Sequence, residues 1–333
     1  MSLKSKIASA QKNHANFLIQ AVSALLLTVG VVTGTVFYPK TPTVHAEEAE
    51  KPAMRIQISP VENRVTLNAN EINEYTFNVD NTGSEGYSFK VYANPYSVLN
   101  EQYSPSFSNQ NAHTQVSRWI TFKNDAGEYG QEATYSVEAG QRKEVTYKIT
   151  VPSDIPGGGQ YAIVFVEAIP KDDNSGGIRT VSRLGLRVFG RTNGETKESA
   201  EILNHNMDSF YMSGKIKTNG TVKNSGNADF NAIFKFKVEK IFGGVVYEDS
   251  KGYDVLPDTT RNIELTWEET PAFGIYRITS TLNALDQSRS TTKIVLIIPV
   301  FMIVILLMLL TITIAWFIIL FRKRQAQKSK LII

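Results

Sequence analysis

The central part of the chain, residues 51 to about 286, consists of short runs in which apolar and polar residues alternate. In one run every second residue is apolar, at Tyr75, Phe77 and Val79. Alternation of this kind gives a β-strand one apolar face, which is the pattern of a strand packed in a sandwich. Glycine, proline, asparagine and aspartate separate the runs, and no long amphipathic helix is indicated there. The pattern predicts an all-β protein.

An internal repeat indicates two related domains. The segment Val79–Gly83 leads from a strand into an Asn-Thr-Gly turn, and Val222–Gly226 repeats it with Asn-Ser-Gly. Later in each copy, Ala139–Val145 resembles Pro257–Ile263. The segments follow in the same order in both copies, which is typical of a duplicated unit. The glycine of each turn supplies a residue that can adopt positive φ.

The first copy is the longer one, and its additional residues fall at about 94–135. We therefore expect a first sandwich at 51–190 with an inserted loop, a polar linker at 191–199 and a second sandwich at 200–290. The predicted fold class is all-β, with two tandem immunoglobulin-like β-sandwiches. An N-terminal signal helix and one C-terminal transmembrane helix complete the predicted architecture.

The C-terminal end contains an uncharged, apolar segment from 294 to 321. At about 1.5 Å per residue, a helix of this length exceeds the roughly 30 Å hydrocarbon core of a bilayer. Arg322, Lys323 and Arg324 follow it and are typical of a cytoplasmic flank. We predict a transmembrane helix at 294–321 and a cytoplasmic basic tail at 322–333. A buried core helix is the alternative, which the absence of a polar face disfavours.

Residues 1–46 have the layout of an export signal. A basic start precedes a long apolar stretch, and Val44-His45-Ala46 has the small residues that signal peptidase prefers. Cleavage after Ala46 would leave Glu47 as the mature start, whereas an uncleaved anchor is the alternative. In either case the positive flank stays in the cytoplasm. We expect a single-pass protein of the cell membrane, with an extracytoplasmic ectodomain and a cytoplasmic C-terminus.

Charge is distributed unevenly along the chain. The formal net charge is +3, but the basic residues before Glu47 and after Phe321 have no acidic residue among them. The part between them is therefore net acidic, which excludes a nucleic-acid partner recognised by basic charge. The chain has no cysteine, so disulfides, cysteine nucleophiles and lipid attachment through cysteine are excluded. This usage suits an exported bacterial protein.

Candidate catalytic and metal-binding groups are few. Outside the signal region the histidines are His113 and His205, which are far apart in sequence. The sequence contains neither a nucleophile elbow nor a phosphate-binding glycine loop. Lys171–Gly177 is rich in Asp, Asn and Gly, but it lacks the ligand spacing of a calcium loop and suits a hairpin connection. We expect no enzymatic activity, no metal and no cofactor.

The inserted loop carries the candidate binding residues. Tyr96, Tyr103, Phe107 and Trp119 lie in or beside a stretch rich in Asn, Gln and Ser. Aromatic faces stack on sugars or receptor side chains, and amides and hydroxyls recognise polar groups. These residues are predicted to contact a glycan or a protein. The alternative is that they fill or cover the core of the sandwich, and for Trp119 the core is favoured.

Several short segments resemble the WxL-interacting surface proteins of Gram-positive bacteria. They are Ile58-Ser59-Pro60, the strand-turn Val79–Gly83, Arg118-Trp119-Ile120 and Ile149–Pro152. The resemblance implies a signal peptide, two immunoglobulin-like domains, one membrane helix and a short basic tail. It also implies a first domain that binds peptidoglycan and a second that binds host or partner proteins. The first domain is similar as well to the broader PapD-like class, whose members share the strand pattern without sharing ligands.

These observations predict a non-catalytic, membrane-anchored surface protein for adhesion or scaffolding. Its partner would be cell-wall peptidoglycan, or an envelope or host protein. One alternative is an envelope assembly chaperone, which would form a stable complex with a secreted protein. Another is a carbohydrate-active hydrolase, which would need two carboxylates converging in a cleft. The sequence leaves the oligomeric state open.

Overall fold

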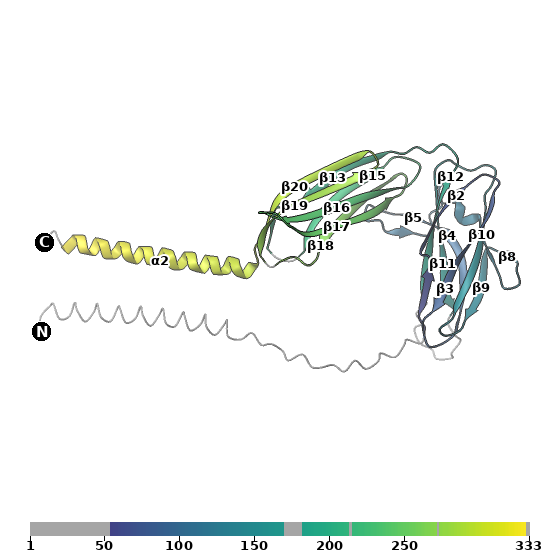
Figure 1. Cartoon of the computed structure of the whole chain (residues 1–333), viewed down its shortest axis with the longest axis horizontal. Helices are drawn as coiled ribbons and strands as arrows, with labels where there is room; N and C mark the ends of the chain where they lie inside the picture. The colour runs from purple at the N-terminus through teal and green to yellow at the C-terminus, as the bar shows by residue number, and fades with distance from the viewer. Residues whose placement is uncertain (1–53, 170–181, 213–214, 272, 331–333) are drawn as a thin grey trace. The chain divides into compact units, whose positions relative to one another are not determined.

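The computed structural model describes residues 54–169, 182–212, 215–271 and 273–330. They form two β-sandwiches and one long helix (Figure 1). The predicted fold class, all-β with two tandem immunoglobulin-like sandwiches, is confirmed. The predicted signal peptide with its cleavage after Ala46, and the connection Lys171–Gly177, lie outside the described residues.

The first sandwich consists of two five-stranded sheets. The first sheet has the order β1 (Ile56–Ser59), β3 (Ile72–Asn81), β10 (Arg142–Thr150), β7 (Ile120–Lys123) and β8 (Tyr129–Gly130). The second sheet has the order β2 (Glu62–Leu67), β12 (Arg183–Thr192), β11 (Gly159–Ile169), β4 (Tyr87–Pro95) and β9 (Glu132–Val137). Between β4 and β7 lie β5 (Ser97–Val98), β6 (Pro105–Ser106) and a 3₁₀-helical turn, Gln115–Arg118.

Alternation along the strands produces the core between these two sheets. Phe77 on β3 and Tyr147 on β10 are buried from one sheet, while their chain neighbours on each side are more exposed. Phe89 on β4 and Leu186 on β12 are buried from the other sheet. Each such side chain contributes roughly 1.5–3 kcal/mol by its removal from water. The period-two pattern therefore determines which face of each strand packs in the core of this sandwich.

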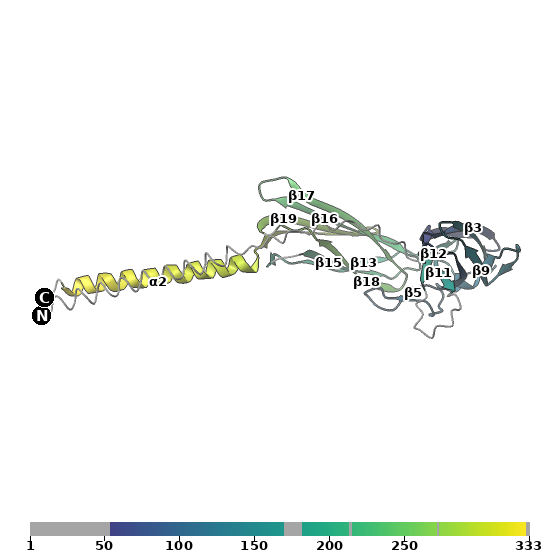
Figure 2. The same ribbon diagram turned by 90° about the horizontal axis from the view of Figure 1, so that it is seen from below.

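The second sandwich has a three-stranded and a five-stranded sheet, seen as two layers in Figure 2. The smaller sheet has the order β13 (Ala200–Met207), β15 (Ile216–Asn224) and β18 (Thr259–Trp267). The larger has the order β14 (Phe210–Tyr211), β20 (Gln287–Ile297), β19 (Gly274–Ala284), β16 (Phe230–Lys240) and β17 (Val245–Val255). Phe234, Phe236 and Trp267 are buried in the core between the layers.

The sequence repeat is also a structural repeat. In the first sandwich β1 pairs with β3, while β2 runs parallel to β12 in the other sheet. In the second sandwich β13 pairs with β15, and β14 runs parallel to β20. Tyr135 and Tyr253 occupy equivalent places, since each donates its hydroxyl hydrogen to a backbone oxygen, that of Lys123 and of Glu264 respectively. In both copies the first part of the chain therefore contributes one strand to one sheet and the next strand to the other sheet.

The turn asparagine of each copy, Asn81 or Asn224, is buried and closes its turn. The side-chain amide of Asn81 donates to the carbonyl oxygens of Glu85 and Glu138 at 2.8 and 3.1 Å. Its own oxygen accepts the N–H of Gly83 at 3.0 Å. Asn224 makes three equivalent contacts at 2.8–2.9 Å. The repeated Asn-x-Gly motif is therefore a hydrogen-bonded corner in both sandwiches.

Replacement of either corner asparagine by alanine is expected to lower the free energy of unfolding by about 1–3 kcal/mol, because buried carbonyl groups lose their donors. Urea unfolding followed by tryptophan fluorescence measures this for each sandwich, since Trp119 lies in the first and Trp267 in the second. Asn109→Ala is the control, because Asn109 is exposed. An equal loss in that control would contradict the corner role.

Two predicted boundaries differ from the structure. Strand β12 continues to Thr192, so the segment between the sandwiches is 193–199. Strand β20 continues to Ile297, and the C-terminal helix α2 begins at Val300 rather than at the predicted residue 294. The run 294–297 is apolar at every position, so the sequence does not mark where the strand ends and the helix begins. In the structure Val295 and Ile297 are buried in the sandwich.

Helix α2 (Val300–Lys330) contains a 25-residue segment, Val300–Arg324, that is long and apolar enough to cross a membrane. At about 1.5 Å per residue it measures about 38 Å, against a hydrocarbon core of roughly 30 Å. Thr311 and Thr313 donate their hydroxyl hydrogens to backbone oxygens of the preceding turn at 2.8 Å. Their polar groups are therefore satisfied within the helix.

Candidate functional site

The inserted segment between β4 and β9, residues 96–131, covers part of the second sheet of the first sandwich. The ring of Tyr96 lies 5.9 Å from that of Phe189, and Phe107 meets Phe165 edge-on at 5.0 Å. Phe165 and Phe189 lie on the sheet face turned away from the main core, and each is 4% exposed. Tyr96 and Phe107 are therefore half-buried in a cover, not displayed on a free loop.

Tyr103 joins the inserted segment to the second sandwich. Its hydroxyl oxygen lies 2.6 Å from Oγ1 of Thr259 and accepts the N–H of Leu256 at 2.7 Å. The guanidinium group of Arg261 lies over its ring, 4.2 Å from the centroid. Burial raises the pKa of the Tyr103 hydroxyl above its ordinary value. This side chain is thus a neutral, fully bonded contact between the sandwiches.

Trp119 packs against the core of the first sandwich, which agrees with the placement that the sequence favoured. Tyr96, Tyr103 and Phe107 are likewise half-buried by contacts within the chain. The structure thus places all four predicted binding residues partly inside the protein. Their contact with a glycan or a protein partner stays a prediction.

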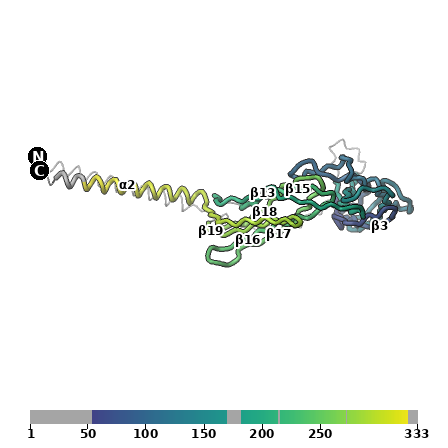
Figure 3. The backbone as a smooth tube through the Cα atoms, turned by 90° about the horizontal axis from the view of Figure 1, so that it is seen from above, coloured from purple at the N-terminus to yellow at the C-terminus, as the bar shows by residue number. Residues whose placement is uncertain are grey.

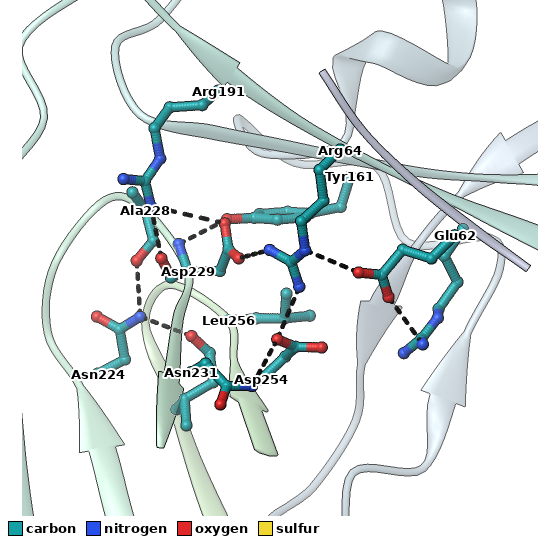
Figure 4. Close-up of polar contacts among 12 residues, drawn as sticks. Glu62, Arg64, Tyr161, Arg191, Asn224, Ala228, Asp229, Asn231, Asp254 and Leu256 are labelled. Carbon is teal, nitrogen blue, oxygen red and sulfur yellow. Dashed lines mark hydrogen bonds and ion pairs between the residues drawn. The ribbon is translucent and has the colours of Figure 1, made fainter. Parts of the chain in front are cut away.

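A cluster of charged side chains also joins the two sandwiches (Figure 4). Arg64 on β2 donates to Glu62 of its own strand, and to Asp229 and Asp254 of the second sandwich, each at 2.7 Å. Burial disfavours the charged form of Arg64. The hydrogen bond to Asp229 and the charges of Asp254 and Glu62 nevertheless raise its pKa above the ordinary value. One cation therefore neutralises carboxylates from both sandwiches.

Asp229 is the most buried member of this cluster, with a side chain 7% exposed. Its carboxylate accepts the Tyr161 hydroxyl at 3.0 Å, and the same hydroxyl oxygen accepts the Asp229 N–H at 2.8 Å. Arg191 donates to the Asp229 backbone oxygen at 2.6 Å. Burial, followed by the charge of Asp229, raises the pKa of Tyr161 well above its ordinary value. Tyr161 therefore stays protonated as a donor to Asp229.

A close backbone approach completes the contact between the sandwiches. The Gly159 N–H donates to the Asn227 carbonyl oxygen at 2.7 Å. Gly158 has φ +106°, and a Cβ atom there would lie 2.1 Å from the Asn227 oxygen. Only glycine combines this backbone conformation with this proximity. We call these contacts, together with the Arg64 cluster and Tyr103, the sandwich junction.

The sandwich junction is suited to holding two domains together, because its carboxylates already face cations or hydroxyl donors. Within the described ranges, no group of three His, Asp or Glu side chains is placed to hold a metal ion. The sequence did not reveal Arg64 and Asp229 as partners, since 165 positions separate them. The repeat itself contained one hint. Counted from the corner asparagine, Asp229 falls where the first copy has Gly86, so the second copy has a charged residue at a position that is glycine in the first.

Strand β12 has a partly unpaired edge. Its second half pairs with β2, whereas Arg183–Leu186 pairs with β11 alone among the described strands. The Arg187 N–H donates to the Val61 oxygen on the β2 side at 3.0 Å. Backbone groups alternate along a strand, so the N–H and C=O groups of Arg183 and Gly185 point to that same side. We call Arg183–Leu186 the open edge.

Comparison with known proteins gives no family. No family model and no curated protein matches the sequence. Among solved structures, a chain of the chaperone–tip adhesin complex of CFA/I fimbriae is 14% identical, with a TM-score of 0.36 over 74% of this chain and 99% of that chain. The E. coli chaperone DraB is 12% identical, with a TM-score of 0.35 over 72% of this chain and 97% of that chain. These neighbours are PapD-like fimbrial chaperones, distant in both sequence and superposition.

Proposed function

We propose that the chain is a membrane-anchored, non-catalytic protein that holds an extended segment of a partner protein outside the cell membrane. It would act there as an assembly chaperone or scaffold for an envelope or secreted protein. The single observation that carries this proposal is the open edge of β12. An unpaired strand edge is a template on which another chain can add a strand.

The open edge combines backbone groups with a side-chain contact. Arg183 and Gly185 present N–H and C=O groups, and Leu184 between them is only partly buried. An added strand would gain main-chain hydrogen bonds and cover Leu184 with an apolar side chain. The guanidinium group of Arg183 lies 4.2 Å from the centre of the Phe165 ring. This contact holds the first residue of the edge in place.

The proposed location rests on helix α2 and its flanks. The segment Val300–Arg324 is apolar enough to span a bilayer and ends in the basic residues 322–324. Basic flanks stay in the cytoplasm, so the sandwiches would lie on the outer side. The export signal predicted from the sequence, cleaved or not, would give the same orientation.

Arg183→Pro tests the open edge. The Arg183 N–H points away from β11, so proline removes a group offered to the partner and leaves the β11 ladder intact. Loss of one hydrogen bond of about 1 kcal/mol predicts roughly fivefold weaker capture. A photo-crosslinking residue at exposed Ser182, in living cells, measures capture of a partner protein. Arg183→Ala keeps the N–H group and is the matched control.

A second cross-linker at exposed Lys223 on β15 reports contacts that do not depend on the open edge. The proposal requires a specific adduct at Ser182 that Arg183→Pro weakens and Arg183→Ala largely retains. Equal adducts at both positions, or an adduct unaffected by proline, would contradict it.

A wall-binding or adhesive role is the second candidate, as the resemblance to WxL-interacting proteins implies. The observation that favours it is the exposed stretch Ser108–Asn111 beside half-buried Phe107. Amides and hydroxyls next to an aromatic ring suit a glycan. Binding of the full chain to purified peptidoglycan sacculi tests this role. Tyr96→Ala and Phe107→Ala should weaken that binding if the aromatic side chains take part, and absence of any binding would exclude the role.

A further inference from the structure

The end of the second sandwich that leads into α2 is fixed by backbone hydrogen bonds. The Leu296 N–H donates to the Ser209 oxygen at 3.0 Å, and the Ile298 N–H donates to the Tyr211 oxygen at 2.9 Å. The helix begins at Val300, and its first turn is bonded to the Pro299 oxygen. The sandwich therefore continues into the helix without a free linker.

Three loops at this same end carry exposed apolar side chains. Phe242 at the β16–β17 turn is fully exposed, Met212 after β14 is 54% exposed, and Phe273 before β19 is 52% exposed. We call these three residues the apolar rim. Figures 2 and 3 show the β16–β17 hairpin standing out from the rest of the sandwich.

Strand register places the apolar rim beside the start of α2. Tyr276 pairs with Lys240 on one side and with Val295 on the other, so Lys240 and Val295 lie at the same level. Phe242, two residues after Lys240, is therefore about level with Ile297. Gly274 pairs with Ile297 and Tyr211 pairs with Ile297, so Phe273 and Met212 lie at or beyond that level. Pro299 is about 7 Å further along at roughly 3.3 Å per residue.

We propose that the apolar rim docks on the lipid bilayer, so that the second sandwich rests on the membrane surface. This inference depends on α2 crossing the membrane, as the proposed function requires. The polar headgroup layer on each side of the hydrocarbon core is roughly 5–8 Å thick. Because only Pro299 separates the bonded end of the sandwich from the helix, the rim lies at the depth of the headgroups. Aromatic side chains are favoured at that interface.

A lipid surface explains the rim better than a protein partner. The bilayer is necessarily within reach of this end, since the chain enters it there. Three loops far apart in sequence present one exposed apolar side chain each at the same level. Lys240 precedes the tip of the hairpin, where its ammonium group can reach lipid phosphates while its stem lies along apolar surface.

The absence of cysteine from the chain makes a direct test available. The full-length variants Phe242→Cys, Leu285→Cys and Ile312→Cys are each labelled with an environment-sensitive fluorophore and reconstituted in phosphatidylcholine vesicles. Leu285 is the matched control, an exposed apolar residue at the β19–β20 turn of the opposite end. Ile312 in the middle of α2 reports whether the helix is inserted. A nitroxide on the lipid headgroup or acyl chain is the quencher.

We expect the Phe242 label to be quenched at least twofold more by the headgroup nitroxide than the Leu285 label, while acyl-chain nitroxide quenches Ile312. Equal, weak quenching at Phe242 and Leu285 with Ile312 quenched would overturn the docking proposal and leave the anchor standing. A blue-shifted Phe242 label without nitroxide quenching would indicate a protein contact and would also overturn it. Failure of quenching at Ile312 would instead refute the membrane anchor.

Discussion

Asp229→Ala is expected to lower the free energy that holds the two sandwiches together by about 2–4 kcal/mol, because the buried Tyr161 hydroxyl and one Arg64 N–H group lose their bonds to a charged acceptor. The variant removes the acceptor of the Tyr161 hydroxyl and one of the three carboxylates that Arg64 contacts, so Glu62 and Asp254 still face Arg64. The Arg64 side chain is 48% exposed, so water compensates part of the loss and the expected value lies below that of a fully buried pair.

Limited proteolysis of the mostly exposed segment 193–199 measures this effect, because its backbone is bonded to Asn227 at the sandwich junction and should be cleaved faster when that contact opens. Hydrogen exchange at the Asp229 amide, which donates to Tyr161, gives a second readout. Asp229→Asn separates the contribution of the hydrogen bond to Tyr161 from that of the charge opposite Arg64. The amide oxygen still accepts the Tyr161 hydroxyl, while the negative charge is lost.

The matched control is Glu264→Ala. Glu264 forms an ion pair with Lys217 at 2.9 Å on the same sandwich, but the two side chains are 45% and 50% exposed. Exposed pairs contribute about 0–1 kcal/mol. If cleavage at 193–199 is as slow in Asp229→Ala as in Glu264→Ala, the cluster around Arg64 does not hold the sandwiches together.

Local alternation was sufficient to predict the strands and the repeat. Tyr75, Phe77 and Val79 follow the alternation that the structure shows for β3, and the Asn-x-Gly turns recur as buried corners. These features depend on residues close in sequence. The strand–helix boundary at Ile297 was mispredicted because a uniformly apolar segment satisfies both a buried strand and a membrane helix.

The surroundings of the aromatic residues could not be predicted from the inserted segment alone. Tyr96 and Phe107 look like display residues in a polar stretch, yet they cover Phe165 and Phe189 of distant strands. The signal lay in β11 (Gly159–Ile169), where consecutive residues are apolar, a pattern typical of a strand covered on both faces. The apolar run of β11 indicates that something covers its outer face. It does not indicate that Tyr96 and Phe107 do so, because that contact joins segments far apart in sequence.

The open edge of β12 was equally beyond the sequence. A strand edge is unpaired where no neighbouring strand lies beside it. In this sandwich that is decided by the point at which the chain passes from β1, in one sheet, to β2, in the other. Arg183 and Gly185 differ from neighbouring strand residues only through this topology. Edge pairing is a general binding mode of sandwiches, and among the described strands Arg183–Leu186 is a stretch of β12 that is paired on one side only.

Gly158→Ala is expected to destabilise the sandwich junction by about 3 kcal/mol or more, since a side chain at positive φ is strained and the new Cβ atom meets backbone. That Cβ would lie 2.1 Å from the Asn227 oxygen, which cannot rotate away as a flexible side chain does. Gly127→Ala is the matched control, because Gly127 has φ +87° with nothing within 4 Å of its Cβ position. It should cost about 1 kcal/mol from backbone strain alone.

Combining Gly158→Ala with Asp229→Ala tests whether the glycine contact and the charged cluster belong to one cooperative junction. If Gly158→Ala already separates the sandwiches, Asp229 loses Arg64 and Tyr161 in the single variant, and its removal should add little. Proteolysis at 193–199 in the four variants of this cycle measures the coupling. Additive effects would show that the two contacts break independently, because a junction that opens as a unit can be lost only once.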